Sequence, residues 1–237
     1  MPALLSLDDV HKSYWRGVHE SVVLAGVSLE VSAAEVVAVW GQRGSGKTTL
    51  AMIAAGMEAP DSGTVRVDGH ALTRWGGHLH RDVGCVLRDG PQSDDFKTVV
   101  DYLAVPLLGD CSLREARRRA SVMLKQLGVA DCAHERWECL TDSERTLVAL
   151  AHALVRRPRV LIADDPTANL DVLQREHVMG LLRQAAHQDG LAVLVTVPDM
   201  PDMAHADRVA LLSEGQLTMS APDPASNVIH FPGQQSV

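Results

Sequence analysis

Residues 36–49 read VVAVWGQRGSGKTT, and this stretch decides the fold. Its first five residues are apolar throughout, as in a strand that is buried on both faces of a sheet. Residues Gly41–Thr48 then match the spacing G-x-x-x-x-G-K-[ST]. A helical pattern follows from Lys47 to Met57 and stops near Pro60. A buried strand, a glycine-rich loop and a helix in this order predict a phosphate-binding turn.

This predicted loop offers the groups that bind nucleotide phosphates. Its glycines let backbone N–H groups point inward, and the N-terminus of the next helix adds partial positive charge. Lys47 would reach the outer phosphates, and the Thr48 hydroxyl would ligate Mg²⁺. The expected nucleotide-binding residues are Gly41, Gln42, Arg43, Gly44, Ser45, Gly46, Lys47, Thr48 and Thr49. The alternative is an ordinary glycine-rich turn between a strand and a helix.

A second apolar run ends in two carboxylates. Val160–Ala163 is followed by Asp164 and Asp165, at the carboxyl end of a predicted strand. Open α/β sheets bind their ligands at that edge. We expect Asp164 to hold Mg²⁺ through its water shell and Asp165 to face the attacking water. Apolar runs with this ending also occur as plain strand ends, so the assignment depends on the phosphate loop being present in the same chain.

The remaining pattern alternates strands with helices, which predicts a mainly parallel sheet. Between residues 98 and 157 the apolar spacing becomes helical, and we interpret this region as a helical insert. Further strands are expected at 22–31, 64–67, 83–87 and 191–196, a closing hairpin at 209–212 and 216–219, and helices at 113–127 and 173–187. Asp68-Gly69 marks a turn.

Composition limits the class of protein. The chain has 237 residues, 46% hydrophobic and 22% charged, which excludes wholesale disorder. A net charge of -8 argues against a protein that coats DNA or anionic lipid, and 3% aromatic residues argue against a binder of single-stranded nucleic acid. We therefore expect no nucleic-acid partner.

Other features favour a chain that works in a reducing compartment and does not cross a bilayer. No run approaches ~20 apolar residues, and the first ten residues lack the basic start of a signal peptide. The four cysteines form no CxxC pair. His78-Leu79-His80 is interpreted as a surface loop, and the arginine-rich run 114–119 as the solvated face of a helix.

Together these motifs resemble the ATP-binding subunits of ABC transporters, over about residues 4–220. The run Asp165–Asp171 (DPTANLD) is similar to the family segment after the Mg²⁺ aspartate, with Asp171 at the D-loop position. Tyr14 lies where the family has an aromatic ring that stacks on adenine, although a tyrosine near a strand is usually a packing residue. Residues 99–108 and the Ala-Asn-Leu-Asp ending look most like the branch that serves lipoprotein release, macrolide export and FtsE-like division complexes.

The resemblance implies an α/β fold: a P-loop NTPase core of RecA type, with an antiparallel β flank and a helical insert. The core would comprise residues 1–87 and 159–220, the helical subdomain 88–158 and a loose tail 221–237. It implies ATP and Mg²⁺ as cofactors, and a homodimer or a heterodimer with another ATP-binding subunit. It also implies an integral-membrane permease partner and a cytoplasmic location, peripheral on the inner face of the cell membrane.

Four positions depart from the family pattern. Arg88 stands where the family has a glutamine that ligates Mg²⁺, although its guanidinium could instead touch phosphate. Asp165 replaces the catalytic glutamate, and Val197 the switch histidine. The signature segment is Leu140, Thr141, Asp142, Ser143 and Glu144 in place of Leu-Ser-Gly-Gly-Gln/Glu.

The signature departure has two interpretations. A carboxylate at Asp142 would repel a phosphate by on the order of 4 kcal/mol for unit charges about 4 Å apart at an effective dielectric of ~20. Alternatively, Thr141-x-x-Glu144 is simply a capping box that starts a helix ending at Leu154. The opposite charges of Arg88 and Asp142 also make a pairing across the dimer conceivable.

From these departures we expect ATP binding with slow or absent hydrolysis. The alternative is a nucleotide-gated scaffold of a membrane complex that never hydrolyses ATP. A soluble ATPase of DNA repair or translation fits less well, because such members of the family carry long coiled coils or tandem cassettes, which this sequence lacks.

Overall fold

The computed structural model describes residues 3–73, 81–87, 97–198 and 201–220. Its centre is a six-stranded sheet with the order β10-β9-β3-β8-β7-β6. The strands are β3 (Glu35–Trp40), β6 (Val83–Val86), β7 (Val160–Asp164), β8 (Ala192–Val197), β9 (Arg208–Ser213) and β10 (Gln216–Ser220). All neighbours pair in parallel except β10, which forms a hairpin with β9. The predicted α/β fold with a mainly parallel sheet is therefore confirmed.

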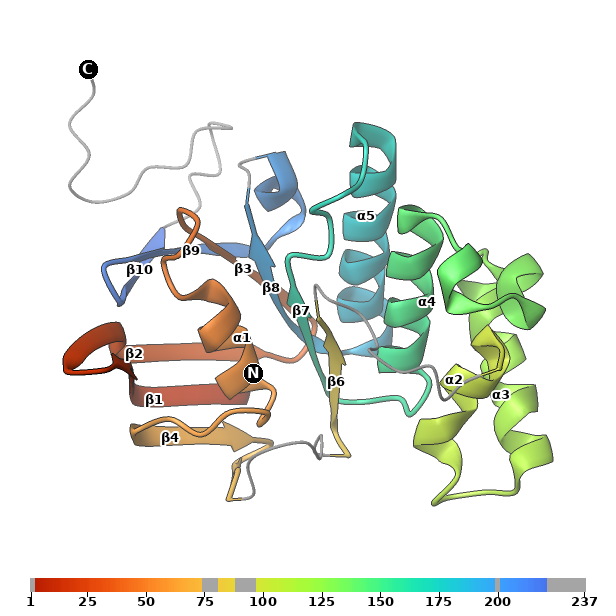
Figure 1. The fold of residues 1–237 in the computed structure, drawn as a ribbon, viewed down its shortest axis with the longest axis horizontal. Coiled ribbons are helices and arrows are strands. Elements are labelled where there is room, and N and C mark those ends of the chain that lie inside the picture. Colours follow the sequence, from red (N-terminus) through yellow and green to blue (C-terminus); the bar gives the residue numbers. More distant parts are fainter. Residues whose placement is uncertain (1–2, 74–80, 88–96, 199–200, 221–237) are drawn as a thin grey trace.

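This sheet is covered on both faces, as Figure 1 shows. Alternate residues of β3 face opposite sides: Val36 and Ala38 pack in one core, and Val37 and Val39 pack in the other. Helices α4 (Asp142–Leu154) and α5 (Val172–Asp189) contribute to the first core. Helix α1 (Lys47–Ala54) and the antiparallel flank contribute to the second. Burial on both faces explains why β3 is apolar throughout.

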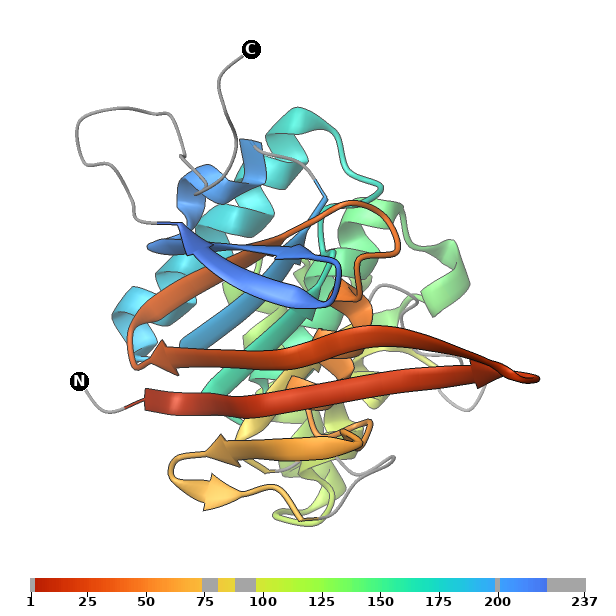
Figure 2. The same ribbon diagram turned by 90° about the vertical axis from the view of Figure 1, so that its left-hand side faces the viewer.

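The antiparallel flank has the order β2-β1-β4-β5 and crosses the lower part of Figure 2. Its strands are β1 (Ala3–Arg16), β2 (His19–Ser32), β4 (Ser62–Val67) and β5 (His70–Ala71). The apolar pattern predicts no strand before residue 22, and this prediction is wrong, because β1 occupies Ala3–Arg16. Asp9 has a φ of 49°, and the pairing with β2 shifts register between Leu7 and Val10. These irregularities interrupt the alternation that reveals a strand in a sequence.

The expected helical insert is present in the described part of residues 97–158. It contains α2 (Val99–Ala104), α3 (Leu113–Gln126) and α4, with short 3₁₀ turns at Val105–Leu107, Ala130–His134 and Trp137–Cys139. The capping box at Thr141 and Glu144 is confirmed, since both reciprocal hydrogen bonds are formed. One helix end was misplaced: α1 stops at Ala54, before Met57, because the chain turns at Gly56 with a φ of 75°.

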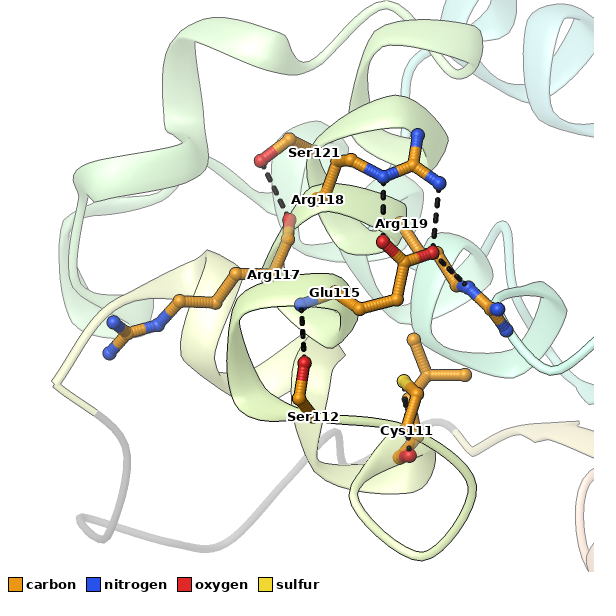
Figure 3. Close-up of polar contacts among 8 residues, drawn as sticks. Cys111, Ser112, Glu115, Arg117, Arg118, Arg119 and Ser121 are labelled. Carbon is orange, nitrogen blue, oxygen red and sulfur yellow. Dashed lines mark hydrogen bonds and ion pairs between the residues drawn. The ribbon is translucent and has the colours of Figure 1, made fainter.

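The arginine-rich run lies on the exposed side of α3, and Figure 3 shows Arg118 and Arg119 paired with Glu115. Arg118 and Arg119 each contact the Glu115 carboxylate at 2.8 Å, and Arg117 contacts Asp101 at 2.7 Å. Hydrogen bonds from Arg118 and Arg119 lower the pKa of Glu115 to about 2. This pairing supports the interpretation of a solvated helix face.

None of the helices in the described ranges is long and apolar enough to cross a membrane. The His78-Leu79-His80 segment and the tail 221–237 lie outside the described residues.

An aromatic stack joins α2 to α4 inside the helical subdomain. His152 stacks on Tyr102 with ring centroids 4.1 Å apart and an interplanar angle of 7°. Trp137 meets the same tyrosine ring edge-on at 5.8 Å. Burial lowers the pKa of His152 to about 4, so the imidazole is neutral in the folded protein.

Stability should therefore fall in mild acid because of His152. The unfolded chain binds a proton at this residue near its ordinary pKa of 6.5, whereas the folded chain binds it only near 4. Between these values the unfolded state holds more protons, and the free energy of unfolding drops by up to about 3 kcal/mol. Urea unfolding of the wild type and His152→Phe across this window tests the effect. Parallel stability curves for the two proteins would contradict it.

Candidate functional site

The glycine-rich loop 41–46 joins β3 to α1 and is closely packed on the strands around it. A β-carbon at Gly41 would lie 2.4 Å from the carbonyl oxygen of Leu212 in β9. Gly46 caps α1 in the left-handed region, with a φ of 102°, and a β-carbon there would lie 2.8 Å from Val23 Cγ1. Only glycine fits both places without a shift of the neighbouring strands.

Polar groups of this loop surround the N-terminus of α1. The Lys47 ammonium donates hydrogen bonds to the carbonyl oxygens of Gly41 at 2.6 Å and Gln42 at 3.1 Å. The Ser45 hydroxyl oxygen is buried and has no hydrogen-bond partner among the described residues. Thr48 is exposed. A helix N-terminus, an ammonium and a hydroxyl that still needs a partner together suit an anionic ligand such as a phosphate.

Asp164 and Asp165 lie at the same edge of the sheet, where β7 ends. Asp164 is only 2% exposed, and its Oδ1 accepts a hydrogen bond of 2.7 Å from the Thr196 hydroxyl. The same hydroxyl accepts a bond of 2.9 Å from the backbone N–H of Asp165. Asp165 has a φ of 49°, a left-handed conformation that aspartate tolerates better than most residues.

Sequence reasoning missed Thr196. The observation that could have identified Thr196 is the parallel pairing of β7 with β8, in which Thr196 stands opposite Asp164. Polar residues at the ends of adjacent parallel strands meet at one edge of a sheet.

The position of the expected switch histidine is filled by a buried apolar side chain. Val197 ends β8, pairs with Trp40 at the end of β3, and is fully buried. The Trp40 indole N–H donates a hydrogen bond of 3.2 Å to the carbonyl oxygen of Pro198. The strand end before the glycine-rich loop is therefore tied to the segment after β8.

Tyr14 extends from β1 to the first turn of α1. Its hydroxyl donates to Glu58 Oε1 at 2.7 Å and lies 3.4 Å from the Thr49 hydroxyl. The tyrosine is 38% exposed. The structure thus places Tyr14 beside the first turn of α1, directly after the glycine-rich loop, and its stacking on adenine stays a prediction.

The signature-like residues Leu140–Glu144 form the start of α4. Asp142 is exposed, and its carboxylate lies 3.5 Å from Arg145 Nη1. Arg145 also donates to the carbonyl oxygens of Trp137 and Glu138. The charge of Asp142 is offset by this arginine and by the helix N-terminus, which reduces the repulsion expected from the sequence. Arg88 lies outside the described residues, so its pairing with Asp142 stays a prediction.

A cavity of about 180 Å³ separates the start of α4 from the end of β7. Its lining includes Asp142 and Arg145 from α4, Asp165 after β7, and Leu87 after β6. Asp142 of the signature-like segment and Asp165 at the end of β7 therefore line a common space within one chain.

A buried polar network follows Asp165, and no sequence pattern predicts it. The Thr167 hydroxyl donates to Asp202 Oδ2 at 2.7 Å, and Arg175 Nη1 lies 3.8 Å from the same oxygen. Nearby, Asp171 caps α5 by accepting a hydrogen bond of 2.9 Å from the Gln174 N–H. These contacts fix residues 165–171 against α5 and the segment after β8.

The groups offered to a cation are the Thr48 hydroxyl, in the first turn of α1, and the Asp164 carboxylate, at the end of β7. No group of three or more His, Cys, Asp or Glu residues in the described ranges is arranged to hold a metal ion. A hydroxyl and one carboxylate suit Mg²⁺, which keeps several waters and takes its other ligands from a bound phosphate.

Comparison with known proteins places these features in context. Residues 24–168 match the family model described as "ABC transporter". The chain is 35% identical over 221 residues to the lipoprotein-releasing system ATP-binding protein LolD of Pseudomonas fluorescens, covering 91% of this chain and 97% of the relative. It is 36% identical over 198 residues to the aliphatic sulfonates import ATP-binding protein SsuB of Cupriavidus necator, covering 83% and 63%. The dimeric structure of the ABC transporter cassette MJ0796 superposes with a TM-score of 0.81 at 28% identity, covering 90% and 96%.

Replacing Thr196 by valine should destabilise the fold, because the buried Asp164 carboxylate loses its donor while the side-chain shape is kept. We expect a loss of about 1–3 kcal/mol in the free energy of unfolding, measured by urea denaturation. Thr64→Val on the exposed face of β4 is the matched control and should change stability by less than about 0.5 kcal/mol. Equal losses in the two variants would contradict the assigned role.

Proposed function

This chain belongs to the ABC transporter family, and from that premise we propose that it is the ATP-binding subunit of a membrane transport complex. We further propose that it binds MgATP at a dimer interface, couples that binding to a membrane partner, and hydrolyses ATP slowly or not at all. The observation that carries ATP binding is the loop 41–48, with its helix N-terminus, the Lys47 ammonium and the buried Ser45 hydroxyl.

In this proposal, the residues of the loop and of the nearby strand ends divide the binding of MgATP between them. The loop N–H groups and Ser45 bind phosphate oxygens, and Lys47 exchanges its two carbonyl partners for the outer phosphates. Thr48 and Asp164 hold Mg²⁺, with Thr196 keeping the carboxylate oriented. When bound, the ion neutralises phosphate charge. Tyr14 stacks on the adenine base.

The proposed partners follow from the relatives. LolD and SsuB are named as ATP-binding proteins of a lipoprotein-releasing and a sulfonate-import system, and MJ0796 is dimeric in its structure. In a head-to-tail dimer, the signature-like segment Leu140–Glu144 of one subunit faces the phosphate loop of the other. We place the dimer, homomeric or heteromeric, against an integral-membrane permease at the cytoplasmic face of the cell membrane.

Slow hydrolysis is argued from the two residues that would handle the attacking water. Asp165 is one methylene shorter than glutamate, which withdraws its carboxylate by ~1.5 Å. A misplacement of ~1 Å can lower a rate by about 10²-fold. Val197, fully buried at the end of β8, offers no hydrogen-bonding side chain to the γ-phosphate. Both defects affect turnover and leave the phosphate contacts intact.

Binding is tested by titrating the purified protein with MgATP in a calorimeter. Replacing Lys47 by alanine should weaken MgATP binding at least about tenfold, because the phosphates lose their principal cation. Lys125→Ala in the last turn of α3 is the control and should bind as the wild type does. Absence of MgATP binding by the wild type would contradict the proposal.

Turnover is tested on the same sample, with and without membrane partners. The wild type should turn over well below the ordinary enzyme range of ~1–10³ s⁻¹. Asp165→Glu combined with Val197→His should raise the rate, provided that MgATP affinity is unchanged. A wild-type rate within the ordinary range would contradict slow hydrolysis, whereas no measurable turnover would favour the nucleotide-gated scaffold.

A further inference from the structure

Tyr14 is held by groups that the adenine-stacking role alone does not require. The hydroxyl end of its ring is anchored to the Glu58 carboxylate at 2.7 Å. One face of the ring is covered by the Lys12 ammonium, which lies 5.5 Å from the ring centroid. The hydroxyl end and one face of the ring are therefore occupied. We assign the 38% exposure of Tyr14 to the rest of the residue, which includes the opposite face of the ring.

Lys12 is fixed behind the ring by its own contacts. Its ammonium lies 3.2 Å from Glu58 Oε1 and 3.3 Å from Asp61 Oδ1, and it donates to the carbonyl oxygen of Ala59 at 2.9 Å. Asp61 is held in turn by the backbone N–H of Ser13 at 2.7 Å. Burial alone would lower the pKa of Lys12, but the two carboxylates raise it, so the cation stays charged behind the tyrosine.

These contacts connect the ring to α1, the helix that follows the phosphate loop, and to the segment after that helix. Glu58, Ala59 and Asp61 follow α1 in the sequence, and Thr49 lies in its first turn, 3.4 Å from the tyrosine hydroxyl. The first turn of α1 and the segment after the helix therefore set the position of a residue that comes from β1. A ring placed in this way keeps a constant distance from the loop.

We propose that Lys12 and Glu58 are positioning residues that hold the Tyr14 ring, with one face open, as a preset platform for the nucleotide base. The inference rests on the proposed function, since it presumes that MgATP binds at the loop. A ring fixed in advance loses little rotamer freedom on binding, and the cation on its covered face adds to the attraction that orders it. The competing explanation is that the same contacts only fasten β1 to residues 58–61.

Two ligands separate these explanations: MgATP, which has a base, and magnesium tripolyphosphate, which has none. Calorimetry with Glu58→Ala should show a loss of about three- to tenfold in MgATP affinity and unchanged affinity for tripolyphosphate. Glu58→Gln keeps an acceptor for the tyrosine hydroxyl and should stay within about twofold of the wild type. Glu30→Ala, an exposed carboxylate on β2, is the matched control and should change neither affinity.

A double-mutant cycle completes the test. Once Tyr14→Ala has removed the ring, Glu58→Ala should cause no further loss of MgATP affinity, because its effect passes through that ring. Additive losses, or an equal loss for tripolyphosphate, would overturn the platform and leave the proposed function intact. A wild-type protein that binds tripolyphosphate and MgATP equally well would also overturn it. A wild type that binds neither ligand would instead overturn the proposed function, and this inference with it.

Discussion

Burial of the central sheet on both faces is the constraint on which the rest of the structure depends. β3, β7 and β8 are buried on both faces, so their side chains are apolar except near the strand ends: Glu35 begins β3, Asp164 ends β7 and Thr196 is the last but one residue of β8. Polar functional side chains are therefore placed at or near the ends of the strands. Parallel pairing then brings those ends to one edge of the sheet. The glycine-rich loop, Asp164 and Thr196 all lie at that edge, although they are far apart in the sequence.

The fold was predictable where the periodicity was regular. β3, β7 and the α4 capping box are visible in the sequence because a fully apolar run or a Thr-x-x-Glu pair has few alternative explanations. β1 was not predictable in this way, because its bulges and the left-handed Asp9 disturb the alternation of polar and apolar residues. Its extended conformation is stabilised by pairing with β2 and with β4, which is distant in the sequence. The end of α1 depended on a single glycine just beyond the helix.

The candidate site divides along the same line. Lys47, Thr48 and Asp164 could be found from spacing, because the motif and the strand end are contiguous in the sequence. Thr196, Trp40 and the pair Lys12–Glu58 could not, because each acts on a partner that is distant along the chain. The effect of Asp142 was overstated from its charge alone, since Arg145 lies one helical turn away and the helix N-terminus favours an anion. Residue type therefore indicated that Asp142 carries a negative charge, whereas its tertiary contacts decide how strongly that charge acts on a nearby phosphate.

The order of strands also bears on how the protein is made. β3 has two neighbours in the sheet, β8 and β9, and both are encoded in residues 192–213. During synthesis the strand before the glycine-rich loop stays without either neighbour until most of the chain has left the ribosome. The helical subdomain, built from contacts close in sequence, can form while β3 waits. A nascent chain stalled before residue 192 would contain the complete loop sequence and still lack the strands that shape it.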